Sequence, residues 1–287
     1  MKNPHAPANL DRSVEIFSIG NELLVGQVLD TNTHWLIRSI TSVGAHVRRA
    51  TMIHDDYDEI GTELRAAVAR RPRLIITTGG LGPTDDDLTL RAIAAGFNRP
   101  LQLDMQALMW VTERYAHIAA IRPNFDASMT ESRRKMAYFP AGSRPIYNPS
   151  GAAPAMVFEP IEGVTIVSLP GVPSEMKDIY TQSLQPVLAE TVGAGGYVER
   201  SLVLQQGDES RLAPALIEVQ SANPSVYVKS RGQKFEDGHF LTVVLSHGGA
   251  NLEDVRSTVR AVELLAIERV TALGYIVLRI VGDEVNQ

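Results

Sequence analysis

The stretch Leu74–Thr89, LIITTGGLGPTDDDLT, decides the fold of the N-terminal part of the chain. Its first five residues are apolar or β-branched and predict a buried strand over Leu74–Thr78. Three glycines follow, and without Cβ atoms their backbone N–H groups can approach an anion. A helix is expected from about Thr84 to Ala95, with the positive end of its dipole near the glycines. The stretch predicts a phosphate-binding loop, with a plain tight turn as the alternative; its glycines are Gly79, Gly80 and Gly82.

Short apolar runs alternate with helical periodicity on both sides of this stretch. Val14–Ile19 reads as the first strand, and 155–158 with 164–169 reads as a hairpin that returns to the sheet. Alternation of this kind is typical of βαβ units. The expected fold class is therefore α/β with a mainly parallel sheet.

A glycine-rich segment, Gly193-Ala-Gly-Gly196, is the expected linker between two domains. The first domain is placed at residues 1–192, with an ordered core from about residue 13. The second is placed at 197–287, where the order strand, helix, strand, strand, helix, strand predicts a ferredoxin-like α+β domain. A length of 287 residues is long for one core and fits two domains.

Composition excludes several classes of function. The chain has no cysteine, which rules out disulfides, Cys-ligated metals and thiol nucleophiles. With 27 basic and 33 acidic side chains, the net charge of −6 gives no reason to expect a nucleic-acid partner. No apolar run is long enough to cross a membrane and the first residues lack a signal-peptide core, so a cytoplasmic protein without a membrane partner is expected.

The glycine stretch contains acidic residues and no lysine. Asp85, Asp86 and Asp87 follow the glycines, and no lysine lies between Arg73 and Arg91. These carboxylates would repel a phosphate unless a divalent cation lay between them, and oxygen ligands favour Mg²⁺ or Mn²⁺. Asp86 and Asp87 are the candidate metal ligands. The alternative is that the aspartates cap the following helix.

Two further regions supply candidate site residues. Ser18–Thr33, SIGNELLVGQVLDTNT, places Glu22 after the first strand, either as a site or metal carboxylate or as a brace within the loop. Asp30 is expected to cap a helix. The segments NPSGAAP (148–154) and LPGVPSEMK (169–177) either close the ligand pocket or form plain tight turns.

These segments occur in the order seen in the CinA (competence/damage-inducible protein A) family, which the chain resembles over about residues 14–188. Gly207-Asp-Glu-Ser210 and Asn223-Pro224 also resemble the small domain that follows in that family. The N-terminal part is similar more broadly to the molybdopterin-binding fold of MoaB, MogA and gephyrin. The resemblance implies a three-layer α/β sandwich, a ferredoxin-like or KH-like second domain, and a homodimer.

The resemblance also implies an activity and a set of site residues. CinA-like proteins are associated with divalent-metal-dependent ADP-ribose pyrophosphatase activity, with Mg²⁺, Mn²⁺ or Co²⁺ as the cofactor. Asp55 and Asp87 fall where the relatives carry functional aspartates and are the expected catalytic residues, and Asp86 matches the CinA pattern. Motif positions assign phosphate and ligand binding to Gly79, Gly80, Gly82, Thr84, Ser150, Gly151, Gly171 and Ser174.

Three functions stay open at this point. The first is hydrolysis of a nucleotide pyrophosphate, with ADP-ribose as the leading substrate; the second is binding of molybdopterin or an adenylated pterin without hydrolysis. The third is a structural or regulatory role. CinA proteins often continue into a nicotinamide mononucleotide deamidase domain, and this activity is not expected because the sequence stops at Gln287.

Overall fold

The computed structural model describes residues 12–205, 208–235 and 238–282, which fold as two compact units. The larger unit comprises residues 12–38 and Val47–Val192, and the smaller comprises Ser39–His46 and 193–282. Residues 1–11 of the expected first domain, and Gly207 of the motif shared with CinA small domains, lie outside the described residues.

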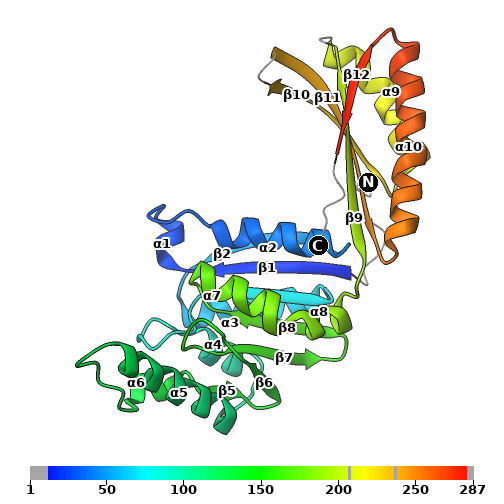
Figure 1. Ribbon diagram of the computed structural model, residues 1–287. Coiled ribbons are helices and arrows are strands. Elements are labelled where there is room, and N and C mark those ends of the chain that lie inside the picture. The colour runs from blue at the N-terminus through cyan, green and yellow to red at the C-terminus, as the bar shows by residue number, and fades with distance from the viewer. Residues whose placement is uncertain (1–11, 206–207, 236–237, 283–287) are drawn as a thin grey trace. The chain divides into compact units, whose positions relative to one another are not determined.

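The larger unit is built on a six-stranded sheet with the order β2-β1-β3-β8-β7-β6 (Figure 1). The strands β1, β3 and β8 pair in parallel, and β7 and β6 continue the sheet antiparallel, so the expected α/β class is confirmed. The hairpin expected from the sequence is the β7–β8 pair. The strands are β1 (Ser13–Ile19), β2 (His46–Ile53), β3 (Leu74–Thr78), β6 (Ser143–Ile146), β7 (Ala155–Ile161) and β8 (Val164–Leu169), and a separate antiparallel pair joins β4 (Leu101–Leu103) to β5 (Tyr138–Pro140).

Helices cover both faces of this sheet (Figure 1). On one face lie α3 (Tyr57–Ala69), α4 (Thr89–Gly96) and α5 (Met105–Ile121). On the other lie α2 (Thr31–Ser42), α7 (Pro173–Asp178), the π-helical turn η2 (Ile179–Ser183) and α8 (Gln185–Thr191). Trp35 of α2 meets Tyr180 of η2 edge to face, with ring centroids 5.0 Å apart. The short helices α1 (Asn21–Leu24) and α6 (Glu131–Lys135) complete the unit.

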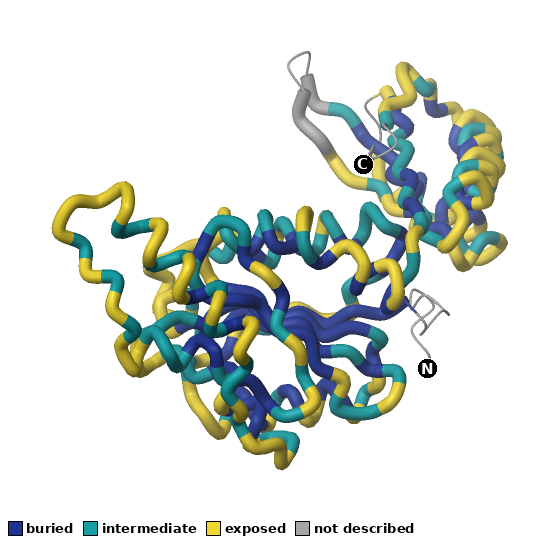
Figure 2. Tube along the Cα trace, turned by 60° about the horizontal axis from the view of Figure 1, so that its bottom comes forward, coloured by how far each residue is buried: buried dark blue, intermediate teal, exposed yellow. Residues whose placement is uncertain are grey.

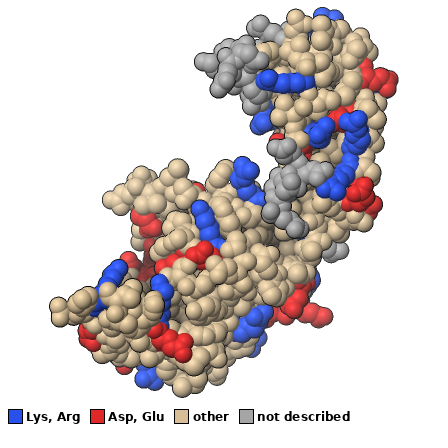
Figure 3. All heavy atoms as spheres, in the orientation of Figure 1, with Lys and Arg blue, Asp and Glu red and all other residues tan. Residues whose placement is uncertain are grey.

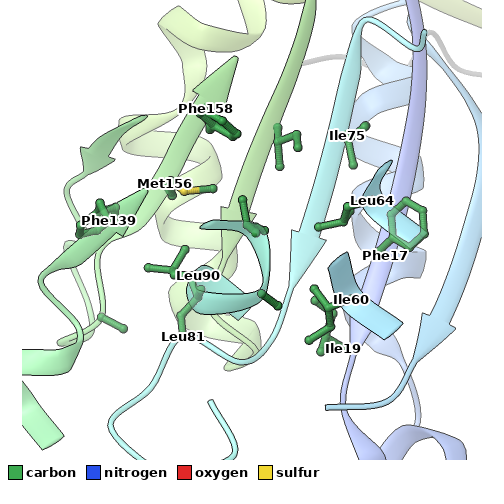
Figure 4. Close-up of a cluster of buried hydrophobic side chains, with 14 of the residues drawn as sticks. Phe17, Ile19, Ile60, Leu64, Ile75, Leu81, Leu90, Phe139, Met156 and Phe158 are labelled. Carbon is green, nitrogen blue, oxygen red and sulfur yellow. The ribbon is translucent and has the colours of Figure 1, made fainter. Parts of the chain in front are cut away.

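The core explains why the central strands read as continuous apolar runs. Every residue of β1 and β3 is buried, because helices lie on both sides (Figure 2). Side chains alternate between the faces of a strand, so Ile75 joins the cluster under α3 and α4 while its buried neighbours Leu74 and Ile76 point to the other face. Figure 4 shows that cluster, in which Phe17 and Ile75 of the sheet lie beside Leu64 of α3.

The smaller unit has the ferredoxin-like order predicted from the sequence. Its elements are β9 (Gly196–Leu204), α9 (Glu209–Ala222), β10 (Tyr227–Phe235), β11 (Gly238–Gly249), α10 (Leu252–Ala272) and β12 (Val277–Val281). The strands form an antiparallel sheet with the order β10-β11-β9-β12. The sheet and both helices bury one continuous hydrophobic cluster that includes Leu202, Val243 and Val259, so this unit has a core of its own.

Two expected boundaries are wrong. The helix placed from about Thr84 begins at Thr89, because residues 84–87 form a turn in which the Asp87 N–H donates to the Thr84 carbonyl at 3.1 Å. The expected linker ends earlier than its glycines suggest. Gly196 already belongs to β9, where it pairs with Gly249 of β11 and is buried.

No helix within the described residues is long and apolar enough to cross a membrane. On the drawn face of each unit, Lys and Arg side chains are scattered among Asp and Glu (Figure 3).

Candidate functional site

The carboxyl ends of β1, β3 and β8 meet at one edge of the sheet, and the loops that follow them touch. The Gly79 N–H donates to the Leu169 carbonyl at 3.0 Å. A Cβ at Gly79, whose φ is +114°, would overlap the Ile19 carbonyl oxygen. A Cβ at Gly171 would lie 3.4 Å from the Gly79 Cα. Glycine at position 79 therefore allows the three loops to approach one another, at the edge where open α/β sheets bind ligands.

A buried polar network fixes these loops from below. The Asn32 amide donates to the Thr78 hydroxyl at 3.0 Å and to the Gly171 carbonyl at 2.8 Å. The Thr78 hydroxyl donates in turn to the Pro170 carbonyl at 3.0 Å. Because Asn32 and Thr78 are buried, each bond replaces lost solvation, and the loops after β3 and β8 are held in one arrangement.

The glycine loop, residues 79–87, takes its shape from Thr89 at the start of α4. The Thr89 hydroxyl donates to the Gly79 carbonyl at 2.9 Å, and its N–H donates to the Gly80 carbonyl at 3.2 Å. Gly80 has φ +67°, and a Cβ there would overlap the Thr89 hydroxyl. Both the backbone conformation and the close approach require glycine at this position.

The aspartates of the loop brace a turn and do not cap α4. Leu88 is the N-cap residue of α4, and no side chain caps the helix. The Thr84 N–H donates to the Asp87 carboxylate at 2.8 Å, and the Thr84 hydroxyl lies within hydrogen-bonding distance of both Asp86 and Asp87. Thr84 thereby holds two carboxylates in a fixed orientation.

A lysine distant in sequence also reaches this turn. The Lys135 ammonium of α6 donates to the carbonyls of Thr84 and Asp87, the latter at 3.2 Å. The glycine stretch contains no lysine, but the folded loop is not free of one. Since the ammonium binds loop carbonyls, it stabilises the turn.

A cavity of about 370 Å³ opens beside the loop, and we call it the acidic cavity. Tyr115 and Met136 form part of its wall, and no Lys or Arg is among its lining residues in the described chain. Its volume falls within the roughly 300–1,000 Å³ usual for small-molecule sites. Five carboxylates line it: Glu22, Asp55, Asp86, Asp87 and Glu175.

The carboxylates act on one another. Burial raises the pKa of Asp55, and the negative charges of Glu22, Asp86 and Asp87 raise it further, against the lowering effect of a hydrogen bond from the Asn21 N–H at 2.8 Å. The pKa of Asp86 is lowered, first by the Thr84 hydroxyl and also by the charge of Lys135. The cavity thus combines a carboxyl group that holds its proton more tightly than usual with one that ionises readily.

Among the described residues, no group of three His, Cys, Asp or Glu side chains is placed to hold a metal ion by itself. A Mg²⁺ ion, however, is usually bound by one or two carboxylates together with water and substrate phosphates. The donor set of the acidic cavity fits that second arrangement, because its carboxylates supply oxygen ligands and its volume has room for a phosphate.

The structure brings together most of the residues predicted from the sequence. Thr84 orients the loop carboxylates without lining the cavity. The Ser150 hydroxyl donates to Asp178, Gly151 lines a different cavity, and Ser174 is exposed in α7. The predicted residues that do line the acidic cavity are Glu22, Asp55, Gly79, Gly80, Gly82, Asp86, Asp87 and Gly171.

Asp30 caps α2, as expected, and also binds the end of β1. Its carboxylate accepts from the Thr33 N–H at 2.9 Å and from the Ser18 hydroxyl at 2.7 Å. The cap fixes the start of α2, and with it the position of Asn32 under the loops.

Sequence reasoning missed Glu175. It lines the acidic cavity, and its carboxylate accepts from the Asn148 amide at 2.8 Å. The same carboxylate lies against Gly151, where a Cβ would overlap it. The Glu175 side chain therefore joins the segments 148–154 and 169–177 above Gly151. The sequence signal that could have identified Glu175 was a carboxylate within the motif LPGVPSEMK.

Comparisons with known proteins agree with this architecture. The family described as "Probable molybdopterin binding domain" matches residues 15–190. A protein of Aeropyrum pernix is 40% identical over 256 residues, which cover 89% of this chain and 91% of the relative. A protein of Pyrococcus horikoshii is 39% identical over 202 residues, 70% of this chain and 77% of the relative.

The crystal structure of the protein CinA, with unknown function, from Thermoplasma acidophilum is 33% identical, with a TM-score of 0.57. The match covers 63% of this chain and 99% of that protein. The chain therefore belongs to the molybdopterin-binding-domain family and is a CinA-like member of it.

Proposed function

We propose that the protein binds a phosphate-bearing, nucleotide-like ligand in the acidic cavity together with a divalent cation, and hydrolyses the pyrophosphate bond of ADP-ribose. The observation that carries this proposal is the shared lining of one cavity by a glycine loop and five carboxylates. The loop suits a phosphate, and the carboxylates suit a cation and a proton transfer.

The charge of the cavity argues for the cation. Two like unit charges 4 Å apart near a protein surface repel each other by roughly 4 kcal/mol. A pyrophosphate beside Asp86 and Asp87 would meet this repulsion, and no Lys or Arg lines the cavity among the described residues. Lys135 binds loop carbonyls outside this lining, so a cation that enters with the ligand would supply the positive charge that the lining lacks.

Asp86 and Asp87 are the residues that would hold the cation, with Glu22 lining the same cavity. Thr84 already orients both aspartates, so little side-chain entropy would be lost on binding. When bound, a divalent cation supplies charge neutralisation and polarisation of the scissile phosphate.

Asp55 is the proposed general base. Its raised pKa makes it a stronger base than an ordinary aspartate, and it lines the same cavity as the glycine loop. It would accept the proton of the water that attacks phosphorus, and the hydrogen bond from the Asn21 N–H orients it for that role.

Pterin binding without hydrolysis is a second candidate. It is favoured by the family match over residues 15–190. Molybdopterin and adenylated pterins also carry phosphate and would meet the same carboxylates, so turnover of a pyrophosphate bond, and not cation dependence, separates the two candidates. The homodimer implied by the resemblance remains a prediction, which light scattering of the purified protein would test.

The direct test is ADP-ribose hydrolysis by the wild type, Asp86→Asn and Asp87→Asn, with and without a chelator. We expect turnover that requires a divalent cation and falls in both variants. Asp85→Asn is the matched control, because Asp85 is an exposed neighbour that does not line the acidic cavity. Circular dichroism checks the fold of each protein. Turnover that resists the chelator contradicts the metal role, and absence of turnover with every metal favours the pterin-binding candidate.

A further inference from the structure

A second cavity, of about 290 Å³, lies beside the acidic one, and we call it the aromatic cavity. One face of α5 lines it with residues at the spacing i, i+3, i+4 and i+7, which brings side chains onto one side of a helix. These residues are Trp110, Glu113, Arg114 and His117. Across from them, Tyr147 precedes the turn that contains Asn148 and Gly151.

This face of α5 is not the face that packs in the core. The buried residues of α5 are Ala107 and Val111, which do not line the cavity. A packing face carries apolar residues at this spacing, whereas the cavity face carries one tryptophan and three polar side chains. Polar side chains are usual on the outer face of a helix, so Trp110 is the residue of this face that core packing does not explain.

The aromatic pair is arranged to receive a flat ring. Trp110 and Tyr147 meet edge to face, with centroids 5.4 Å apart and planes 66° apart. Because the two rings pack against each other, a ligand ring would stack on the exposed surface of Tyr147 and not between the two rings. Tyr147 remains 49% exposed despite this contact, which leaves ring surface for a ligand.

Polar groups for the edge of such a ring are present as well. A terminal nitrogen of Arg114 donates to the Ser150 carbonyl, while its Nε is buried and finds no hydrogen-bond partner among the described residues. Glu113 supplies an acceptor on the same wall. A planar nitrogen heterocycle presents both acceptors and donors along its edge. The terminal N–H groups of Arg114 and the carboxylate of Glu113 can meet both kinds, whereas the buried Nε is out of a ligand's reach.

The two cavities share a wall. Ala152 lines both, and Asn148 of the aromatic cavity donates to Glu175 of the acidic cavity at 2.8 Å. We propose that the aromatic cavity is the ring-binding subsite for the ligand whose phosphates enter the acidic cavity, the ring being a purine or a pterin. This inference rests on the proposed function only in placing the phosphates of the ligand in the acidic cavity.

The test uses Trp110 as its own reporter. The chain has two tryptophans, so Trp35→Phe leaves Trp110 as the single one. This protein is titrated with AMP, with pterin and with ribose 5-phosphate in the presence of Mg²⁺, and none of these has a pyrophosphate bond to hydrolyse. We expect AMP or pterin to quench the fluorescence and ribose 5-phosphate not to; quenching by AMP alone assigns a nucleotide base, and by pterin alone a pterin.

Tyr147→Leu supplies the second measurement, by calorimetry. Loss of one base–aromatic stack should weaken binding of the quenching ligand at least about fivefold. Tyr227→Leu is the matched control, because Tyr227 is 47% exposed and lies in the smaller unit. Its affinity should equal that of the wild type.

Three outcomes would overturn the inference: no quenching by either ring, equal quenching by ribose 5-phosphate, or unchanged affinity in Tyr147→Leu. ADP-ribose should also displace the ring ligand, and failure to do so would separate the two cavities. Quenching in a protein that never hydrolyses ADP-ribose would refute the proposed function and leave this inference standing. If Tyr147→Leu hydrolyses ADP-ribose with the KM and kcat of the wild type, this inference is refuted and the proposed function stands.

Discussion

The acidic cavity and the aromatic cavity are neighbours with opposite character. The first is bordered by backbone loops at the ends of parallel strands and by five carboxylates. The second is bordered by one face of α5 and has two aromatic rings, an arginine, a histidine and a single carboxylate, that of Glu113. The segment Asn148–Pro154 separates them, and α5 contributes Tyr115 to one and Trp110 to the other.

The difference shows how one fold can bind two chemically different parts of a ligand in two differently lined cavities. The loops at the edge of the sheet place glycines and carboxylates around one cavity, which suits a phosphate together with a metal ion. A helix face presents long side chains, which suit a ring. Substitutions in one cavity should therefore leave the other functional.

The largest effect is expected for Asp55→Asn. Loss of a general base typically costs about 10²–10⁴-fold in rate, so kcat should fall at least about 100-fold. The amide keeps an oxygen that can accept from the Asn21 N–H, so the fold should be retained. Binding of AMP or pterin at the aromatic cavity should change less than about twofold. A parallel loss of ring binding would show that the cavities are not separable.

Gly80→Val should lower the stability of the fold as well as ligand binding. The residue has φ +67° and its Cβ would overlap the Thr89 hydroxyl, so we expect about 2–3 kcal/mol lower stability in urea unfolding. Gly171→Ala is the matched control, because its Cβ would lie 3.4 Å from Gly79 Cα in ordinary contact. Equal stability of both variants would mean that the loop shape does not depend on Gly80.

Lys135→Met tests the link between α6 and the glycine loop. Hydrogen bonds from a charged group contribute about 1.5–3 kcal/mol when fully effective, and partial exposure places the expected loss near 1 kcal/mol. The unfolding midpoint in urea should fall, and ADP-ribose affinity should weaken. Unchanged values of both would show that the turn holds without the ammonium.

Glu22→Gln should shift the pH dependence of hydrolysis. The negative charge of Glu22 helps to raise the pKa of Asp55, so its removal lowers that pKa. Because a general base acts when deprotonated, the acidic limb of the kcat profile should move to lower pH. The profile of Asp85→Asn should keep its position. A shift to higher pH in Glu22→Gln would contradict the assigned role of Asp55.

Much of the fold follows from local pattern. Leu74–Thr78 is a strand as predicted because its residues are apolar or β-branched and both of its faces are buried. The predicted start of α4 is wrong because Thr84 and Asp87 form a hydrogen bond and close a turn, which helical periodicity does not reveal. Gly196 was assigned to a linker because composition carries no record of its partner strand.

The site residues that lie in sequence motifs directly after strands could be predicted from the sequence. Glu22, Asp55 and the adjacent pair Asp86 and Asp87 lie far apart in sequence, but each of these three segments follows a different strand and all of them line one cavity. Lys135 could not be found in this way, because it reaches the loop from α6 through a tertiary contact. The aromatic cavity was missed for the same reason, since Tyr147 and Trp110 meet only in the folded chain.

The affinity of ADP-ribose with and without Mg²⁺, measured by calorimetry, tests the central claim most directly. If phosphates enter the acidic cavity with a cation, Mg²⁺ should tighten binding at least about tenfold, a difference of about 1.4 kcal/mol. The gain should shrink in Asp86→Asn and Asp87→Asn and persist in Asp85→Asn. Binding that is equally tight in excess chelator would contradict the account.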